Sequence, residues 1–195
     1  MGDLNMNGSI IFVVFVLLGL LGLGLIGLLW AIVTTNMFKR LVVKVDEAES
    51  GIDVALEKRY DLLTKMVSAT KGYAAYEEKT LKSIVELRKP THQSPIGEKQ
   101  AFANQLTDGM SKLNVVLEQY PDLKASVNFL KLQEASMEVE ENLQAARRVY
   151  NANVSTYNQK IVVFPNSVIA NFQHYTKKDF FEVEANKRKD VEFNF

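Results

Sequence analysis

Cysteine is absent from this chain of 195 residues, and proline and histidine are scarce. Without cysteine there can be no disulfide, no thiolate nucleophile and no cysteine-ligated metal. Four prolines and ten glycines are too few for disorder on a large scale. Acidic and basic side chains balance at 23 each, so the basic excess typical of nucleic-acid-binding proteins is missing and no nucleic-acid partner is expected. The length suits one domain with an appendage.

The sequence also lacks the ligand spacing of known metal sites. His92 and His174 are its two histidines, and neither forms a His-x-x-x-His or Glu-x-x-His pair, as zinc sites and diiron bundles require. Three glutamates share one helical face: Glu134, Glu138 and Glu141. Such a face either binds a cation or is a solvated acidic surface. There is no Gly-rich phosphate loop and no Gly-x-Ser-x-Gly motif. We therefore expect no metal, no cofactor and no enzymatic activity.

One long apolar run is present near the N-terminus. Residues 10–33 carry no charge and would form a helix of roughly 36 Å, enough to cross a bilayer with some tilt. A cleaved signal peptide is the competing interpretation, but it has a basic start and a shorter apolar core. Residues 1–9 contain Asp3 and no Lys or Arg. The run therefore predicts an uncleaved transmembrane helix after a short N-terminal segment.

The flanking charges predict how this helix is oriented. No basic side chain precedes the run, whereas Lys39, Arg40 and Lys44 follow it. Basic residues stay on the cytoplasmic side of a membrane, and acidic neighbours count for little. We expect the N-terminus outside and the rest of the chain in the cytoplasm.

Small residues form one face of the apolar run. Gly24, Gly27 and Ala31 fall on the same side of a helical wheel. Small faces let two membrane helices approach closely, although glycine is also simply common in such helices. The pattern is one reason to expect a homo-oligomer.

The remaining sequence predicts an all-α fold. Apolar residues at spacings of three and four are typical of helices with one buried face. Such segments predict a bundle over residues 34–172, with three long helices and one short one at about 37–89, 98–120, 126–163 and 167–172. We expect the bundle to be antiparallel and up-and-down. In a single copy, the long first helix should leave Leu41, Val45 and Ile52 uncovered near the membrane, a second reason to expect association.

The repeated pair in YNANVSTYNQ is either a ligand box or a helix-packing seam. Tyr150, Tyr157 and Phe164 are seven residues apart, so they should stack along one face and bury against neighbouring helices. Asn151 and Asn158 lie beside the tyrosines and can bond loop carbonyls. The packing interpretation is favoured.

The tail over residues 173–195 departs from helical spacing. Its apolar side chains should dock, either on the same chain or on a neighbouring copy: Phe180, Phe181, Val191, Phe193 and Phe195. Lys187, Arg188 and Lys189 form a small basic cluster that either touches anionic lipid or lies in a solvated turn.

Five stretches resemble the LemA family of bacterial membrane-anchored helical proteins. In order they are LVVKVDEAESGIDVALEKRYDLL, VSATKGYAAYEEKTL, YPDLKASVNFLKLQ, ARRVYNANVSTYNQ and FPNSVIANF, which cover most of residues 41–172. The resemblance implies an up-and-down bundle with one N-terminal membrane segment in the bacterial inner membrane, and it implies no reaction. The family often has a proline after its Asp-Leu-Ile triplet, where this chain has Thr64.

These observations favour a non-enzymatic, membrane-anchored helical scaffold that self-assembles. The alternative is an accessory protein in membrane signalling or in the envelope-stress response, which recruits a partner protein. The expected partners are membrane lipid, further copies of the chain, and an unidentified membrane or cytoplasmic protein.

Overall fold

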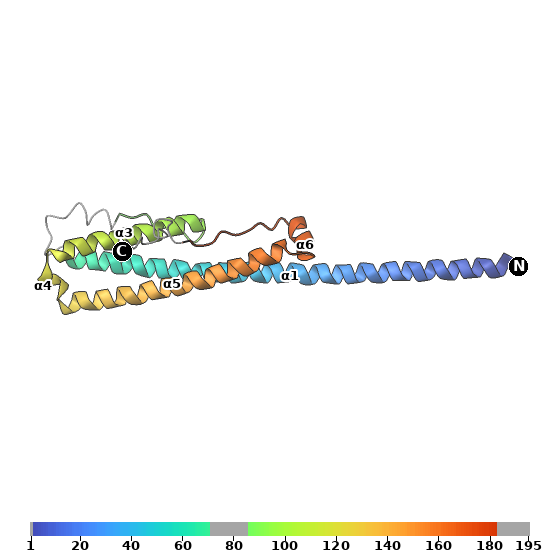
Figure 1. Cartoon of the computed structure of the whole chain (residues 1–195), viewed down its shortest axis with the longest axis horizontal. Helices are drawn as coiled ribbons and strands as arrows, with labels where there is room; N and C mark the ends of the chain where they lie inside the picture. Colours follow the sequence, from blue (N-terminus) through green and yellow to red (C-terminus); the bar gives the residue numbers. More distant parts are fainter. Residues whose placement is uncertain (1, 71–85, 183–195) are drawn as a thin grey trace, which may run out of the picture. The chain divides into compact units, whose positions relative to one another are not determined.

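The computed structural model describes residues 2–70 and 86–182, and these residues form helices and loops without a β-strand. The all-α prediction is confirmed. The helices are labelled in Figure 1: α1 (Gly2–Thr70), α3 (Ile96–Glu118), α4 (Pro121–Lys124), α5 (Val127–Val162) and α6 (Asn166–Phe172). Contacts divide the chain into two compact units. The first unit is Met1–Val43 with Tyr157–Lys177, and the second unit is Lys44–Thr156 with Lys178–Phe195.

Helix α1 joins segments that the sequence pattern had separated. It runs without interruption from Gly2 to Thr70, so residues 2–9 continue into the apolar run as one helix and there is no break between 33 and 37. Proline, which would break such a helix, does not occur before Pro90. Thr64 fits within the helix, and its hydroxyl donates to Asp61 O at 2.9 Å. Residues 71–85, predicted to be helical, lie outside the described residues.

The ends of the other helices follow local signals. Residues 86–89 are not helical, so the predicted end of the first long helix at Lys89 does not hold. Helix α3 begins after Pro95, and α5 begins after Ser126, whose hydroxyl accepts the Phe129 N–H at 3.3 Å as an N-cap. Pro121 opens α4, a short helix that the apolar spacing did not predict, because proline suits the first helical position.

In the second unit, α1 and α5 run in opposite directions. The Asn153 amide donates to Lys44 O at 3.1 Å. Farther along α1, Arg59 pairs with Glu140 at 2.9 Å. Rising residue numbers on α1 therefore meet falling numbers on α5, as expected for antiparallel neighbours.

Helices α1 and α3 run in the same direction. Asp53 binds Lys99 at the start of α3, and Arg59 donates to Thr107 farther along both helices. The loop before α3 has already returned along α1, because its His92 lies 2.7 Å from Asp53. The chain therefore reverses direction between α3 and α5, and residues 71–85, which connect α1 to the loop before α3, lie outside the described residues.

The core of the second unit covers the apolar stripe of α1. Val45 and Ile52 are fully buried within the single chain. Leu41, which belongs to the first unit, is half-buried. The expectation that a single copy leaves this stripe uncovered is therefore wrong at Val45 and Ile52, because α3 and α5 supply the missing neighbours. These helices contribute the following fully or almost fully buried side chains: Phe102, Leu106, Leu113, Phe129 and Leu143.

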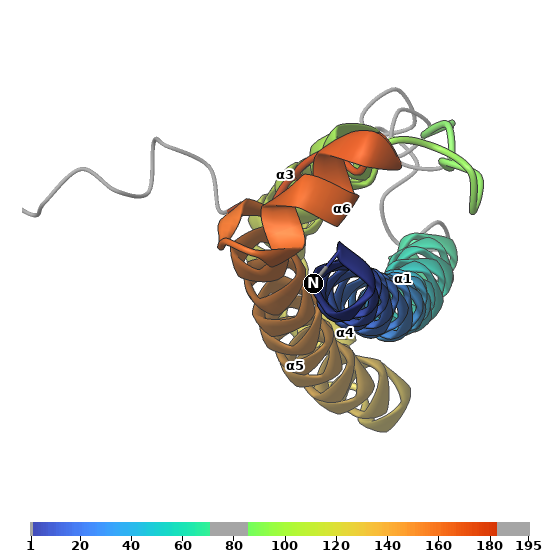
Figure 2. The ribbon, with the colours of Figure 1, turned by 90° about the vertical axis from the view of Figure 1, so that its right-hand side faces the viewer.

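The first unit is held by an aromatic cluster. The Tyr175 ring lies 5.1 Å from the Phe38 ring of α1 and 6.4 Å from the Tyr157 ring of α5, measured between centroids. Gln173 also donates to the Thr35 hydroxyl at 2.7 Å. Helix α6 consequently lies beside α1 in both views (Figure 1 and Figure 2).

A left-handed residue directs the chain from α6 back toward this cluster. His174 has φ 57°. Its N–H donates to Asn171 O at 3.2 Å, and the next N–H, of Tyr175, donates to Ala170 O at 2.9 Å. This pair of bonds is the Schellman arrangement that ends many helices. It turns the backbone so that Tyr175 packs against α1.

The predicted aromatic seam is only partly realised. Tyr150 and Tyr157 are each 2% exposed, whereas Phe164 is 79% exposed. Its inclusion in the seam is wrong, because α5 ends at Val162, shortly before Pro165. Beyond that end, a spacing of seven residues no longer keeps a side chain on the same face.

Candidate functional site

The N-terminal part of α1 has the surface of a membrane-spanning helix. Among the described helices, α1 alone is long and apolar enough to cross a membrane, and none of its most apolar window is buried. Side chains such as Phe15 and Leu23 are more than two-thirds exposed. In a bilayer every backbone polar group must be paired internally, which a continuous helix achieves.

Two of the three small residues, Gly24 and Gly27, are open to contact among the described residues. A Cβ atom built on Gly24 or Gly27 would meet nothing within 4 Å, and Ala31 is half-buried. The three basic residues that predict orientation, Lys39, Arg40 and Lys44, are exposed.

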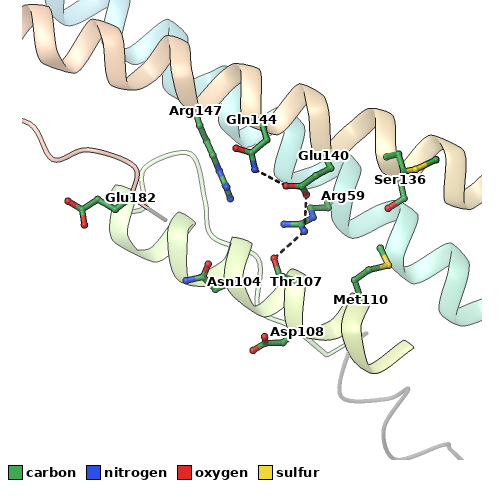
Figure 3. A pocket seen from close by; sticks show the side chains of 11 residues that line it. Arg59, Asn104, Thr107, Asp108, Met110, Ser136, Glu140, Gln144, Arg147 and Glu182 are labelled. Carbon is green, nitrogen blue, oxygen red and sulfur yellow. Dashed lines mark hydrogen bonds and ion pairs between the residues drawn. The ribbon is translucent and has the colours of Figure 1, made fainter. Parts of the chain in front are cut away.

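A polar cavity of about 470 Å³ lies between α1, α3 and α5 in the second unit (Figure 3). Arg59 reaches into it from α1. Its guanidinium donates to Ala103 O at 3.2 Å and to the Thr107 hydroxyl at 3.1 Å, and it pairs with Glu140 at 2.9 Å. Gln144 donates to the same carboxylate at 2.9 Å. One side chain thus connects all three helices.

The second guanidinium of the cavity belongs to Arg147. It stacks over the Phe181 ring, 4.7 Å from the centroid, and its Nε is buried without a hydrogen-bond partner among the described residues. Burial lowers the pKa of both arginines, and Glu140 opposes that shift. Three carboxylates line the same cavity: Asp108, Glu140 and Glu182. Because both signs of charge are present, the cavity has no clear preference for an anion or a cation, and its main contacts tie helices together.

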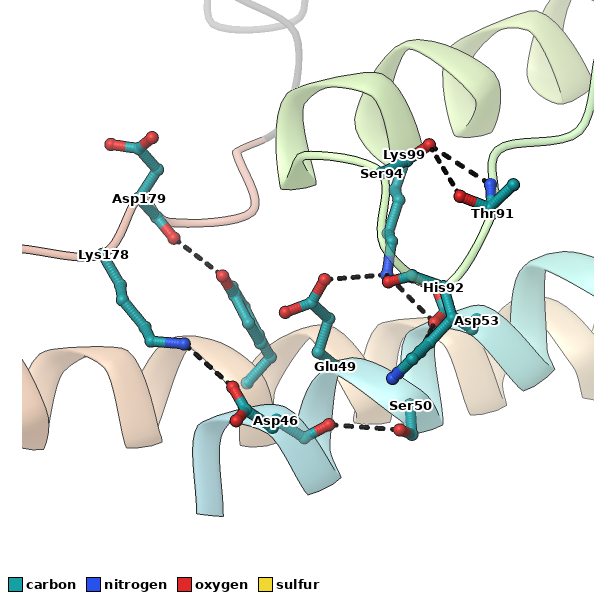
Figure 4. A network of polar contacts seen from close by, with 11 residues as sticks. Asp46, Glu49, Ser50, Asp53, Thr91, His92, Ser94, Lys99, Lys178 and Asp179 are labelled. Carbon is teal, nitrogen blue, oxygen red and sulfur yellow. Dashed lines mark hydrogen bonds and ion pairs between the residues drawn. The ribbon is translucent and has the colours of Figure 1, made fainter. Parts of the chain in front are cut away.

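A fully buried lysine organises a second polar cluster (Figure 4). The Lys99 ammonium donates to Glu49 at 2.7 Å, to the Asp53 carboxylate at 2.7 and 2.9 Å, and to His92 O at 3.1 Å. Each of its three protons therefore has an acceptor. The cluster fixes the start of α3 and the preceding loop against α1.

This lysine was not among the residues predicted from the sequence, although a signal was present. Lys99 precedes Phe102, Ala103 and Leu106 at helical spacings of three, four and seven, so it occupies a position of the apolar stripe. A charged side chain at such a position needs partners of opposite charge when buried.

The C-terminal strap, residues 174–182, is held by three members of the repeated Tyr-Asn pairs: Tyr150, Asn151 and Tyr157. In the second unit, the Tyr150 hydroxyl donates to Asp179 O at 3.0 Å. Asn151 makes two bonds with Phe181: its amide donates to the carbonyl at 3.0 Å, and its oxygen accepts the N–H at 2.9 Å. In the first unit, the Tyr157 hydroxyl donates to Thr176 O at 2.8 Å. The repeat thus binds the protein's own backbone.

Burial also changes the acidity of both tyrosines. Desolvation, followed by the nearby carboxylates Glu49, Asp179 and Asp46, raises the pKa of Tyr150 to about 12. Desolvation and then Tyr175 raise the pKa of Tyr157 above its ordinary value. Both hydroxyls stay protonated and act as donors near neutral pH.

The tail docks on its own chain over the described residues, where Phe181 is 2% exposed and Phe180 is 42% exposed. The predictions for Lys187, Arg188, Lys189 and for the three apolar residues after them concern residues outside the described part. The face with Glu134, Glu138 and Glu141 is exposed. Within 2–70 and 86–182, no group of three or more His, Asp or Glu side chains is arranged to hold a metal ion.

Together these features define a helical-bundle protein with an N-terminal helix suited to a membrane. The LemA family model matches residues 48–195, and the chain belongs to the LemA family. It is 30% identical over 152 residues to Protein LemA of Metamycoplasma hominis, a match that covers 76% of this chain and 69% of that protein. It is also similar to Magnetosome protein MamQ of Magnetospirillum gryphiswaldense, at 22% identity over 173 residues.

A further relative is Magnetosome protein MamQ 1 of Paramagnetospirillum magneticum, at 23% identity over 174 residues. Each MamQ match covers 75% of this chain and 64% of the MamQ protein, so the chain spans somewhat less than two-thirds of those relatives. The resemblance seen in the sequence is confirmed at the level of the family.

Proposed function

We propose that this protein is a non-catalytic, membrane-anchored helical scaffold that assembles with further copies of itself at the bacterial inner membrane. The observation that carries the proposal is the contrast along α1. Its first part exposes nearly every apolar side chain between residues 12 and 33, whereas the part after Lys44 buries its apolar stripe inside the bundle. Only a lipid or protein environment would cover the first part, since exposed apolar surface of this extent is unfavourable in water.

The bonding within the polar cavity supports a structural role. Arg59, the side chain that reaches into the cavity from α1, is shared between Thr107, Ala103 and Glu140. These bonds use the guanidinium for helix packing and do not pair a nucleophile with a base.

The proposed orientation places the N-terminus outside and the bundle in the cytoplasm. Lys39, Arg40 and Lys44 support it, because all three follow the apolar stretch and are exposed. A reporter that is active only outside the cytoplasm, fused after Phe195, should be silent. The matched variant replaces the three basic residues by glutamine and adds lysines before residue 10, and its fusion should become active. Activity of the unaltered fusion would reverse the assignment.

Self-assembly is proposed to use the small face of the apolar helix. Because Val45 and Ile52 are buried within their own chain, the exposed Gly24 and Gly27 and the half-buried Ala31 are the residues proposed to meet a second copy. Small residues allow close helix–helix approach in lipid.

The chain lacks cysteine, so a single introduced cysteine is unique in each copy. Cysteine at Gly27 should form disulfide-linked dimers in native membranes. Cysteine at Leu29, on the opposite face of the wheel, should form few and serves as the matched control. Equal yields at both positions, or none at Gly27 with normal expression, would refute assembly through this face. Capture of a kinase or protease in place of further copies would favour the signalling alternative.

A further inference from the structure

The first unit exposes a second apolar surface in addition to the α1 run. We define the α5–α6 corner as the exposed apolar residues around the end of α5 and α6: Val162, Val163, Phe164, Val168 and Phe172. Phe164 is 79% exposed and Phe172 is 81% exposed. Val168 and Phe172 are four residues apart on α6 and therefore share one face. Two phenylalanine rings this exposed leave apolar area in water, and contact with an apolar partner would be favourable.

The position of the corner along α1 identifies that partner. Gln173, next to Phe172, bonds Thr35 at 2.7 Å, and Thr35 lies two residues after the apolar run ends at 33. Two residues advance a helix by about 3 Å. The polar layer on each side of a bilayer core is about 5–8 Å thick. If α1 crosses the membrane, Gln173 therefore lies within the headgroup layer, and α6 lies at the lipid surface. In Figure 1, α1 continues beyond α6 toward Gly2 without a neighbouring helix.

The charges around the corner fit an anionic surface. Residues 34–43 and 157–177 contain Lys39, Arg40, Lys160 and Lys177 and no aspartate or glutamate, although the whole chain has equal numbers of both signs. All four side chains are exposed. Such a local basic excess next to a membrane attracts anionic lipid headgroups. It would also repel the same surface of a second copy, which disfavours a dimer contact here.

We propose that the α5–α6 corner is an interfacial membrane contact, in which Phe164, Val168 and Phe172 enter the headgroup layer and the four basic side chains bind anionic lipid. The proposal rests on the proposed anchoring by α1 and adds a second point of attachment. A chain held at both places would be fixed in its tilt and rotation relative to the membrane, since amphipathic side chains at the interface anchor such segments. It also explains why the sequence has phenylalanine at two positions that the fold does not bury.

The test uses the full-length chain in vesicles of phosphatidylcholine, with or without phosphatidylglycerol. Single cysteines carry an environment-sensitive fluorophore, and nitroxide-labelled lipids quench it from the headgroup region. Labels at Phe172 and, separately, at Val168 should be quenched and shifted to the blue. Val127, an apolar residue of the second unit that is 68% exposed, is the matched control and should show neither effect. Leu20 near the middle of the apolar run reports on anchoring by α1, and it is read with lipids that carry the nitroxide near the end of the acyl chain.

The outcomes separate this inference from the proposed anchoring. Quenching at Leu20 together with a Phe172 signal as weak as that of Val127 would overturn the corner contact and leave the anchor in place. No quenching at Leu20 would overturn both. Disulfide dimers through the Phe172 position without lipid quenching would show that a second copy covers the corner, and would also overturn the proposal.

A charge variant tests the headgroup part. The double change Lys160→Gln and Lys177→Gln should lower quenching at Phe172 in vesicles with phosphatidylglycerol and leave it unchanged in phosphatidylcholine alone. Lys112→Gln with Lys131→Gln, two exposed lysines of the second unit, is the matched control and should change neither. An equal loss in both lipids, or no loss, would refute binding of anionic lipid by these residues. Retained helicity and melting temperature would show that each variant is folded.

Discussion

Replacing Tyr157 separates the packing of the aromatic repeat from its hydrogen bond. The ring is 2% exposed and contacts Tyr175, while the hydroxyl donates to Thr176 O at 2.8 Å. Tyr157→Ala removes both, and loss of a large buried aromatic ring typically costs about 3–5 kcal/mol in the free energy of unfolding. Tyr157→Phe removes only the hydrogen bond, which contributes about 0.5–1.5 kcal/mol. The low end applies, because Thr176 is exposed and water can bind the freed carbonyl.

Phe164→Ala is the matched control, because Phe164 follows Tyr157 by seven residues, the same spacing that separates Tyr157 from Tyr150. Its ring is 79% exposed, so the expected change in stability without a membrane is within about 0.5 kcal/mol. The assay is chemical and thermal unfolding of the full chain in mild detergent, followed by circular dichroism. For a protein of this size, the Tyr157→Ala cost corresponds to a fall in melting temperature of roughly 6–20 °C.

Three results would contradict this reasoning. An unchanged melting temperature for Tyr157→Ala would mean that the ring is not packed in the folded chain. A Phe164→Ala effect as large as that of Tyr157→Ala would mean that the seven-residue register continues past the end of α5. A Tyr157→Phe effect as large as that of Tyr157→Ala would assign the stabilisation to the hydroxyl and not to the ring.

Three further predictions concern the polar contacts. Between the ordinary tyrosine pKa of 10.0 and the raised pKa of about 12, folded Tyr150 keeps its proton while the unfolded residue loses it, so unfolding free energy should fall with rising pH by about 2–3 kcal/mol. In denaturant titrations, the stability difference between wild type and Tyr150→Phe should be constant below pH 10 and change only in that range. Lys99→Met leaves the Glu49 and Asp53 carboxylates facing each other, with about a fifth to a quarter of each side chain exposed. It should lower the free energy of unfolding by about 3 kcal/mol, near the low end for a broken buried pair. Lys112→Met, at an exposed lysine, should change it by almost nothing in the same assay. Asn151→Ala removes both bonds to Phe181 and should speed amide hydrogen exchange at Phe181 with little loss of helix; unchanged exchange there would show that the strap is held elsewhere.

How well the helices and their contacts could be predicted depends on whether the sequence pattern is repeated over many residues. Repeated spacing over many residues predicted the helices 98–120, 126–163 and 167–172 to within two residues at each end, because burying a stripe requires that periodicity. The apolar run over residues 10–33 likewise predicted a helix, and these residues lie within α1. Val45 and Ile52 were placed on the correct face of α1, but the spacing does not reveal which neighbour covers that face.

Most of the errors arise where the outcome depends on distant parts of the chain, and one arises from a local signal that was not used. The parallel course of α1 and α3 is defined by the contacts of Asp53 with Lys99 and of Arg59 with Thr107, which join residues 46 and 48 positions apart, and no local pattern encodes them. Phe164 was misplaced because the helix ends before Pro165, a local signal that was present. Tyr175 and Phe38 were overlooked because their contact joins segments far apart in the sequence, through the left-handed turn at His174.

The antiparallel pairing of α1 with α5 also has a consequence for the order of folding during synthesis. The bond from Asn153 to Lys44 joins residues 109 positions apart. At about 5–20 residues per second, that separation takes roughly 5–20 s to translate. Helix α1 can form and enter the membrane within this time, but the stripe containing Val45 and Ile52 stays without its α5 neighbour until the ribosome has made most of the chain. The nascent protein is therefore tethered before it is packed, and an early stop before α5 would leave an anchored helix with an exposed apolar stripe.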